Sequence, residues 1–324
     1  MRTLILCIAA AFTVVGQPAN QNVDRVLHFK HAEATKDLQE LVTVVRSITQ
    51  IAKASFDSTQ KTLTLNAPAG QAATAEWLFN QLDQPVKQQV ATSFTTDTGD
   101  FVQTFYLSKS LTNQELYEAA TVVRSTGELR HLFVYGPSGA IVVRGSAADM
   151  RLAAWLLQKF DLPANRMESA PRVNDTGDLV QVFYFAQPLP NPQLQEIATV
   201  VRSVGELRRL FAYSPSRAIV VRGSAADLRL AAWLFKEFDQ PVNRPGFAPR
   251  VNEYGRLEND DDLLKVFYLA PTKTMQRLQE IATEVRSTIR IPRLFVSNAH
   301  HAIVVRGTSA QLARAAQMIE ERDR

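Results

Sequence analysis

The apolar positions of the chain change their period in a fixed order, and each change predicts an element. Residues 182–185 form a short β-rich run that predicts a strand, and residues 192–203 carry apolar side chains at the spacing of one helix face. Two further β-rich runs, 210–213 and 218–222, predict a second and a third strand separated by a turn at Pro215. The predicted order so far is strand, helix, strand, strand.

A second helix completes this unit. Ser224 and Asp227 stand three residues apart, the spacing of a capping box, in which the two side chains satisfy free backbone N–H groups at the start of a helix. Gly223 permits a tight corner before them, and the helix ends before Pro241. We therefore predict an α+β unit of the order β-α-β-β-α, in which two helices cover one face of a small three-stranded sheet.

This unit occurs four times. The sequence Thr-Val-Val-Arg-Ser occupies residues 43–47, 121–125 and 199–203, and a fourth copy with one change occupies 283–287, at spacings of 78, 78 and 84 residues. Other landmarks share these spacings: the run Ala-Ile-Val-Val-Arg-Gly at 140–145, 218–223 and 302–307, the tryptophans Trp77, Trp155 and Trp233, and the aspartates Asp83, Asp161, Asp239 and Asp323. The repeat predicts modules at 23–86, 100–163, 178–241 and 262–324.

The first module and the connections depart from this regularity. Asn66-Ala67 replaces the Arg-Gly of the other modules, which we interpret as the mark of a capping unit. The connections are long for simple loops, so we expect an extra hairpin in some of them. The six residues inserted before the fourth module predict a surface loop whose acidic side chains, Glu258 and those of residues 260–262, are solvated.

Composition and charge exclude several classes of protein. The 324 residues are 46% hydrophobic and 21% charged, which is typical of a soluble globular protein. A net charge of +4 does not require a nucleic-acid partner. The single cysteine, Cys7, excludes an intramolecular disulfide framework and a cysteine-rich metal site.

The first residues have the pattern of a signal peptide. Arg2 precedes an apolar stretch at 4–15 that is too short to span a bilayer, and small residues lie before Gln17. We predict a signal peptide at 1–16 and a mature chain that starts near Gln17. The residues directly before Cys7 lack the small side chain of a lipoprotein signal. The expected location is therefore outside the cytoplasm, either periplasmic or secreted.

The repeat resembles the N-domains of bacterial secretins. The features that carry this resemblance are the Val-Phe-Tyr strand, the Val-Arg-Ser helix end, the Ala-Ile-Val-Val-Arg-Gly strand, the Ser-Ala-Ala-Asp helix start and the Phe-Asp-Gln-Pro helix end, from about Val26 to Asp323. The resemblance implies KH-like, ring-building modules of secretion and pilus machines that are periplasmic, bind neighbouring subunits and inner-membrane components, and have no catalytic residues. No segment corresponds to the channel domain of secretins, so only assembly at the level of modules is implied.

Repeated arginines are the best candidates for protein contacts. Two interpretations remain open: cations near helix ends offset the helix dipole and strand-end arginines are often solvated, or a row of them forms salt bridges between modules or subunits. The candidates are Arg46, Arg124, Arg202 and Arg286 at the end of the first helix, and Arg144, Arg222 and Arg306 at the end of the third strand. The tryptophans favour core or interface packing over a ligand platform.

The chain offers few groups for catalysis, metal binding or cofactor binding. The five histidines share no repeat position, and the pair His300-His301 lies in a predicted turn. Residues 136–139 spell the Gly-x-x-Gly of nucleic-acid-binding KH domains, but they lie between two predicted strands and indicate a hairpin turn. Phosphate-loop, dinucleotide and hydrolase motifs are absent from the sequence. We predict no catalytic residues, no cofactor and no metal.

The sequence therefore predicts a non-enzymatic, exported scaffold or assembly protein. Its expected partners are other proteins, namely further copies of itself or components of secretion or pilus machinery. The alternative is an array of KH-like repeats that binds a ligand or nucleic acid, which the basic isoelectric point of about 9.2 would favour.

Overall fold

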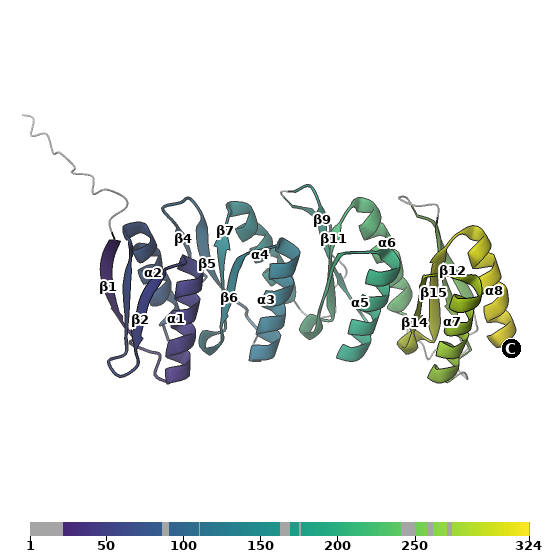
Figure 1. Cartoon of the computed structure of the whole chain (residues 1–324), viewed down its shortest axis with the longest axis horizontal. Coiled ribbons are helices and arrows are strands. Elements are labelled where there is room, and N and C mark those ends of the chain that lie inside the picture. The colour runs from purple at the N-terminus through teal and green to yellow at the C-terminus, as the bar shows by residue number, and fades with distance from the viewer. Residues whose placement is uncertain are drawn as a thin grey trace, which may run out of the picture.

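Four modules stand in a row along the molecule (Figure 1). The computed structural model describes residues 22–85, 91–109, 111–162, 169–174, 176–240, 250–257, 262–270 and 274–323. Within these ranges each module contains one small antiparallel sheet and two long helices. The predicted α+β fold with four tandem β-α-β-β-α units is confirmed.

The elements repeat from module to module with nearly constant bounds. The first module contains β1 (Asn22–His28), α1 (Thr35–Thr49), β2 (Lys53–Asp57), β3 (Thr62–Pro68) and α2 (Ala69–Leu82). The second contains β4 (Ser93–Thr95), β5 (Phe101–Tyr106), α3 (Asn113–Gly127), β6 (His131–Tyr135), β7 (Ala140–Gly145) and α4 (Ala147–Phe160). The third contains β8 (Arg172–Val173), β9 (Leu179–Tyr184), α5 (Asn191–Gly205), β10 (Arg209–Tyr213), β11 (Ala218–Gly223) and α6 (Ala225–Phe238). The fourth contains β12 (Arg250–Arg256), β13 (Leu263–Tyr268), α7 (Met275–Ile289), β14 (Arg293–Ser297), β15 (Ala302–Gly307) and α8 (Ser309–Asp323).

The predicted three-stranded sheet is present in every module, and three modules add a fourth strand. The first sheet has the order β1-β3-β2, whereas the second has the order β4-β5-β7-β6, and the third and fourth follow the same pattern. The added strands β4, β8 and β12 lie in the connections, where an extra hairpin was expected. Because β8 has only two residues, its pairing with β9 makes it a strand, and no alternating pattern could identify it beforehand.

Helix starts follow from local side-chain chemistry. At the start of α6 the Ser224 hydroxyl accepts a hydrogen bond from the Asp227 N–H, and the Asp227 carboxylate accepts one from the Ser224 N–H, which confirms the predicted capping box. A Cβ atom at Gly223 would lie 2.7 Å from the Asp227 carboxylate, so this corner admits only glycine without a shift. Ser146 and Asp149 form the same box in α4. The repeated aspartates act locally too: the Asp83 carboxylate accepts hydrogen bonds from three backbone N–H groups, those of residues 30–32.

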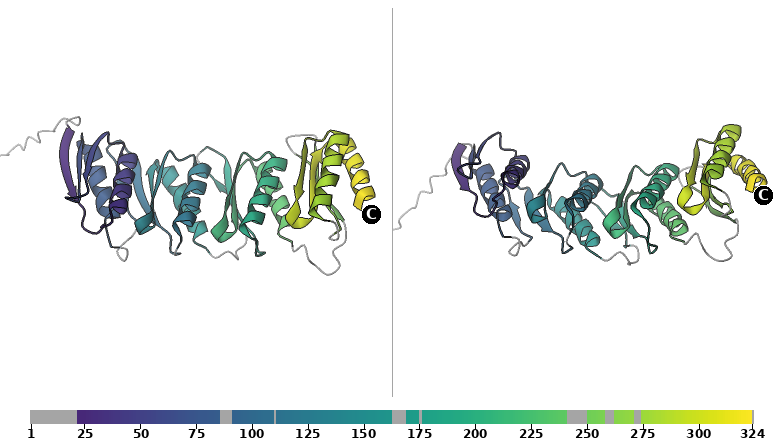
Figure 2. Two further views of the ribbon diagram at one scale, coloured as in Figure 1. Left: turned by 60° about the horizontal axis from the view of Figure 1, so that its bottom comes forward. Right: turned by 90° about the horizontal axis from the view of Figure 1, so that it is seen from below.

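The sheets after the first are covered on both faces. Each sheet packs its own two helices on one face, and the helices of the preceding module, mainly the first one, lie on the other (Figure 2). The contact is made by α1 with β6, by α3 with β10 and by α5 with β14. Three of the four hydrophobic clusters therefore include residues of two successive modules. We call each such contact a joint, numbered one to three from the N-terminus.

Some predicted features lie outside the described residues. These are the signal peptide at 1–16 with Cys7, the mature start at Gln17, and the acidic side chains of residues 258, 260 and 261. The module bounds stay predictions as folding units. Across the described ranges, no helix has both the length and the apolar character needed to cross a membrane.

Candidate interaction surfaces

A glutamate on each first helix binds the next module. Glu40 of α1 accepts a hydrogen bond of 2.7 Å from the backbone N–H of Gly136, and Glu118 of α3 accepts one of the same length from Ser214. Glu196 of α5 accepts bonds of 3.2 Å from the Ala299 N–H and the Ser297 hydroxyl. The donors lie in or beside the turn between the last two strands of the next module, so a glutamate at one repeat position binds this turn in all three joints.

The strand arginines reach across the joints from the other side. Arg144, Arg222 and Arg306 donate to the backbone carbonyls of residues 48, 126 and 204, at the ends of the preceding first helices, over 3.1, 2.8 and 3.0 Å. Their side chains are only 12%, 3% and 7% exposed. A guanidinium so deeply buried requires charged or polar partners. These three arginines therefore contact neighbouring modules of the same chain, and a role in contacts with other proteins stays a prediction for them.

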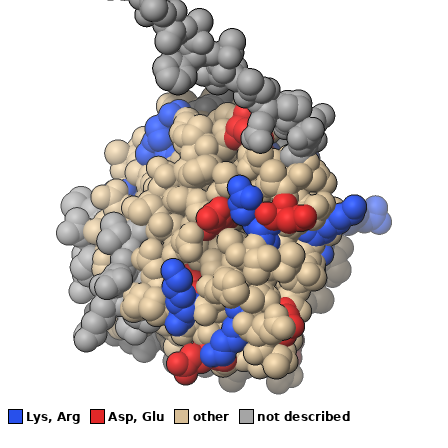
Figure 3. Space-filling model, turned by 90° about the vertical axis from the view of Figure 1, so that its left-hand side faces the viewer, with Lys and Arg blue, Asp and Glu red and all other residues tan. Residues whose placement is uncertain are grey.

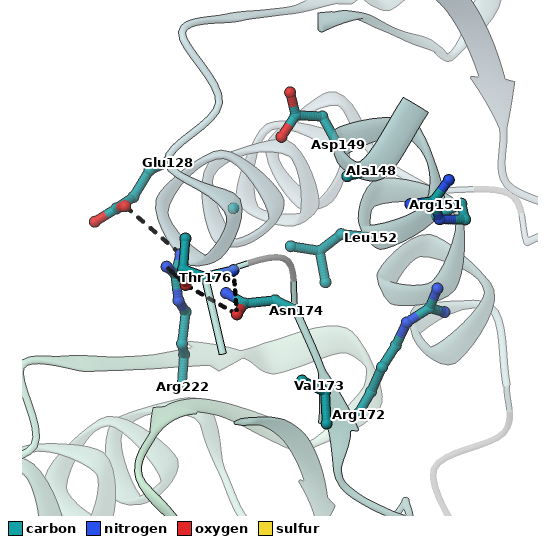
Figure 4. A pocket seen from close by; sticks show the side chains of 11 residues that line it. Glu128, Ala148, Asp149, Arg151, Leu152, Arg172, Val173, Asn174, Thr176 and Arg222 are labelled. Atoms are coloured by element: carbon teal, nitrogen blue, oxygen red, sulfur yellow. Dashed lines mark hydrogen bonds and ion pairs between the residues drawn. The ribbon is translucent and has the colours of Figure 1, made fainter. Parts of the chain in front are cut away.

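Arg222 shows how such a charge is accommodated. Its guanidinium donates to the Asp178 carboxylate over 3.0 Å and to the Thr176 hydroxyl over 3.0 Å, and it lies 3.6 Å from Glu128 of the preceding module. Figure 4 shows Arg222, Thr176 and Glu128 beside a cavity of about 160 Å³ at joint two, which Arg151 and Arg172 also line. Because each donor of the guanidinium has an acceptor, its charge serves the joint itself.

The helix arginines have the opposite setting. Arg46, Arg124, Arg202 and Arg286 are all exposed. The last three each donate to the carbonyl of the second residue of the following strand, at positions 132, 210 and 294 in their own modules, and the Arg202 bond is 2.5 Å long. The structure therefore separates the predicted arginines into a buried set at the joints and an exposed set along one side of the array.

Aromatic side chains of successive modules pack against each other in the joints. Phe160 of α4 lies 4.2 Å from Tyr213 of the next module, measured between ring centroids, and Phe238 of α6 lies 5.0 Å from His300. Trp77 stacks on Phe94, which belongs to the added strand β4, at 5.4 Å. The repeated tryptophan position therefore packs against the neighbouring module, and this explains why it recurs.

Several joint residues escaped the sequence analysis. Glu40, Glu118 and Glu196 were detectable only as a shared repeat position. Arg209 and Arg293 pair with Glu128 and Glu206 of the preceding module over 2.6 and 2.7 Å, and nothing in the local sequence marks them. His300 was expected in a turn and does lie in one, a 3-10 turn at Asn298–His300, but it is 3% exposed. Burial lowers its pKa, although the charges of Glu196 and Asp239 act in the opposite direction.

The free sheet face of the first module is polar. Asp24, Ser55, Asp57, Thr64 and Asn66 occupy the positions that carry Val102, Phe133, Tyr135, Val142 and Arg144 at the first joint. Asn66 donates to Asp24 over 2.7 Å and accepts from Asn22 over 3.0 Å, so the face has its own hydrogen-bond network. Figure 3 shows this end of the molecule, where charged residues of both signs lie among uncharged ones. This face differs from every sheet face that lies in a joint.

The free helix face of the fourth module is polar as well. In α5 the stripe that faces the next module consists of Glu196, Val200 and Val204, and the corresponding stripe of α7 consists of Glu280, Glu284 and Thr288. Arg322 of α8 replaces Phe238 and donates to Glu284 over 2.6 Å. Both ends of the array therefore carry polar residues at most of the positions where the joints carry apolar ones, and Val26, which is 53% exposed, is an apolar residue on the free sheet face.

The described residues contain no group of three or more histidine, cysteine, aspartate or glutamate side chains that could hold a metal ion. The Gly-x-x-Gly at 136–139 forms a 3-10 turn between β6 and β7, as the predicted hairpin requires. These observations define the class of protein by its geometry, as a capped linear array of small α+β modules.

No family model matches the sequence, and no curated protein matches it either. Among solved structures, the chain is similar to the N-terminal domain of the secretin XcpQ from Pseudomonas aeruginosa, with 14% identity, a TM-score of 0.19, and coverage of 43% of this chain and 62% of that one. A second structure, XcpQN012, has 12% identity and a TM-score of 0.23 over 68% of this chain and all of that one. Aeromonas hydrophila ExeD has 13% identity and a TM-score of 0.17 over 92% of this chain and 55% of that one.

These solved structures are of secretins, the proteins whose N-domains the repeat resembles. The chain spans 62% of the length of the XcpQ N-terminal structure that it matches. At such identities and TM-scores nothing about the function of this chain follows from the similarity.

Proposed function

We propose that this chain is a non-enzymatic, exported scaffold that works through protein–protein contacts along the side of a closed four-module array. The observation that carries the proposal is the contrast between three apolar joints and two polar ends. In repeat proteins, terminal units with polar outer faces end the stack and keep it soluble. The array then has a fixed length, and its sides are the surfaces left for partners.

The side formed by the first helices supports this proposal. The helices α1, α3, α5 and α7 stand in a row along the array (Figure 1), and each presents an exposed threonine and an exposed arginine at the same positions. The threonine hydroxyls bond to carbonyls of their own helices, as Thr199 does to Gln195 over 2.8 Å. A regular row of guanidinium groups suits carboxylates of a neighbouring protein. We assign partner contacts to Arg46, Arg124, Arg202 and Arg286.

The export of the chain rests on the predicted signal peptide at 1–16 alone. The partners that we propose are further copies of the chain, bound side by side, or components of a secretion or pilus machine. The polar ends disfavour filaments in which one array stacks on the next, because burying unpaired polar groups costs free energy.

The first test is the reversal of charge at two exposed arginines. Light scattering on the chain from Gln17 gives its mass, and a discrete multiple of the monomer should fall to the monomer with Arg124→Glu and Arg202→Glu together. Lys236→Glu with Arg314→Glu makes the same charge change at exposed positions of the second helices α6 and α8 and should leave the mass unchanged. A multiple that survives reversal at the first helices contradicts the assigned surface.

A second test applies if the purified chain is a monomer, so that its partner is another protein. A photo-crosslinking residue placed at Thr121 or Thr199 in the source cell should give a discrete cross-linked protein, and the same residue at Arg229 should give none. Salt-sensitive binding of single-stranded nucleic acid would instead support the nucleic-acid alternative.

A further inference from the structure

Joint two contains a half-buried lysine, Lys109, whose ammonium lies at the contact between two modules. The Lys109 ammonium donates to the carbonyls of Phe160 and Leu162 over 3.1 and 2.5 Å, and it lies 3.5 Å from the Ser216 hydroxyl. Ser216 itself donates to Phe160 over 2.8 Å. The ammonium therefore has oxygen neighbours from both modules and links them at the joint.

Joint one has the same pocket without the lysine. The residues that correspond to Lys109, Phe160, Leu162 and Ser216 are His31, Leu82, Gln84 and Ser138. All four line a cavity of about 370 Å³, and among the described residues its lining contains no lysine or arginine. The Ser138 hydroxyl is buried and has no hydrogen-bond partner in the described part of the chain, whereas its counterpart Ser216 is paired. The pocket therefore keeps the residues whose oxygens accept hydrogen bonds at joint two, and it lacks the cation that donates them.

The surroundings of this cavity carry one more acidic residue than those of joint two. Glu33 stands where the second module has Leu111, whereas Asp37 and Asp83, which also line the cavity, correspond to Glu115 and Asp161. Tyr135, on the opposite side of the joint, has a raised pKa, first because of burial and then because of the charges of Asp37, Asp83 and Glu40. Negative charge in a partly enclosed pocket favours a cation over a neutral or anionic group.

Joint three fills the equivalent space in another way. His300 replaces Ser216 there, its ring lies 5.0 Å from that of Phe238, and it is hydrogen-bonded to the Phe238 backbone. Two of the three joints thus place a nitrogen of their own at this point.

We propose that the cavity at joint one is a binding site for a primary ammonium group, the end of a lysine side chain. The carbonyls of Leu82 and Gln84 and the Ser138 hydroxyl are the acceptors, by correspondence with the Lys109 site, and Glu33 and Asp37 supply the charge. The source that we assign to this ammonium is a lysine of a partner protein, and this assignment rests on the proposed function.

The probe is Nα-acetyl-lysine amide, titrated into the chain from Gln17 while backbone amide shifts are followed by NMR. Residues 31–34, 83–85 and 137–138 should shift in a saturable manner. Nα-acetyl-norleucine amide, which lacks the ammonium, should give no such shifts. This readout is independent of oligomeric state, so it separates failure of the site from failure of the proposed function.

Reciprocal exchange between the joints supplies matched variants. His31→Lys should fill the pocket from within, weaken binding of the probe by about tenfold or more, and raise the melting temperature. Lys109→His should open the equivalent pocket and produce a second set of shifts near Asp161 and Ser216. If Lys109→His does not fold, the binding of the probe by His31→Lys is sufficient to test the proposed site.

Saturable binding of the probe by the unaltered chain supports the site. The proposal is overturned if the unaltered chain does not bind the probe, if norleucine amide shifts the same residues equally, or if His31→Lys binds the probe as well as the unaltered chain does.

Discussion

At the scale of single residues, one amino-acid type has two roles that depend on its surroundings. The strand arginines are largely buried, and each donates to a helix-end carbonyl across a joint and pairs with a carboxylate of its own module. The helix arginines are exposed and bond to strand carbonyls of their own modules. Removing a buried charge leaves its partners unsatisfied, whereas removing an exposed one lets water replace it.

Arg222→Met should therefore destabilise the chain by about 3 kcal/mol, because Asp178 loses one of its cations and the Thr126 carbonyl loses its donor. The matched change Arg202→Met should cost about 1 kcal/mol or less. Urea unfolding followed by circular dichroism measures both. If both variants lose the same free energy of unfolding, the contacts of Arg222 in the joint stabilise the chain no more than the exposed hydrogen bond of Arg202 does.

His300 makes joint three sensitive to pH. Burial lowers its pKa below the ordinary value of 6.5, so the unfolded chain binds this proton more tightly than the folded chain. Stability is therefore complete above about pH 6.5 and is lost as the pH falls through that value. The loss is smaller to the extent that Glu196 and Asp239 stabilise the protonated ring.

The test compares urea midpoints at about pH 7.5 and about pH 5.5. His300→Ser, which places the joint-two residue in joint three, should reduce the fall in midpoint. His301→Asn is the control, since asparagine tolerates the left-handed backbone found there. A fall that is unchanged by His300→Ser would assign the pH dependence to other groups.

At the scale of elements, one stripe on each first helix decides whether a module can be followed by another. The helices α5 and α7 share most of their buried positions, and both pack on their own sheets. They differ in the outward stripe, where Val200 and Val204 become Glu284 and Thr288. Local sequence identity between helices therefore does not imply equal packing partners.

Restoring the apolar stripe should create a new association. Glu284→Val, Thr288→Val and Arg322→Phe reproduce the residues of the third module, and the chain should then form oligomers whose mass rises with concentration, because it exposes an apolar face. Light scattering measures this change. Gln158→Val with Lys236→Val, at one exposed position of the second helices α4 and α6, should leave the mass as in the unaltered chain. An unchanged mass for the triple variant would mean that the stripe does not control stacking.

At the scale of the whole molecule, the joints make neighbouring modules depend on one another. The cores of the first three modules each include residues of the next sheet, and only the fourth module has a cluster of its own residues alone within the described ranges. Each small core would be marginal in isolation, so stability is shared along the array.

A chain that ends at residue 241 should therefore aggregate, since it exposes Val200, Val204 and Phe238, which are at most 3% exposed in the full chain. The same fragment with Val200→Glu, Val204→Thr and Phe238→Arg has the polar residues that the fourth module carries at these positions, and it should be monodisperse. Size exclusion and thermal melting compare the two. A soluble, monodisperse fragment without these changes would contradict shared stability.

The sequence by itself determined the order of elements, the number of modules and the capping boxes, because these depend on residues close together in the chain. It also marked the first module as different through Asn66. An extra hairpin was expected in some connections, but the positions of the short strands β4 and β8 could not be predicted, because pairing defines these strands and they are too short to show a pattern. Only the tertiary structure decided which arginines are buried.

The polar ends and the cavity at joint one were likewise decided only by the tertiary structure. Glu40 and Gly136, which meet at 2.7 Å, are 96 residues apart, so no local pattern relates them. Whether Val200 is an interface residue or a core residue depends on the sheet that follows it. The joints come from contact between one repeat and the next, and the surfaces free for partners follow from that contact.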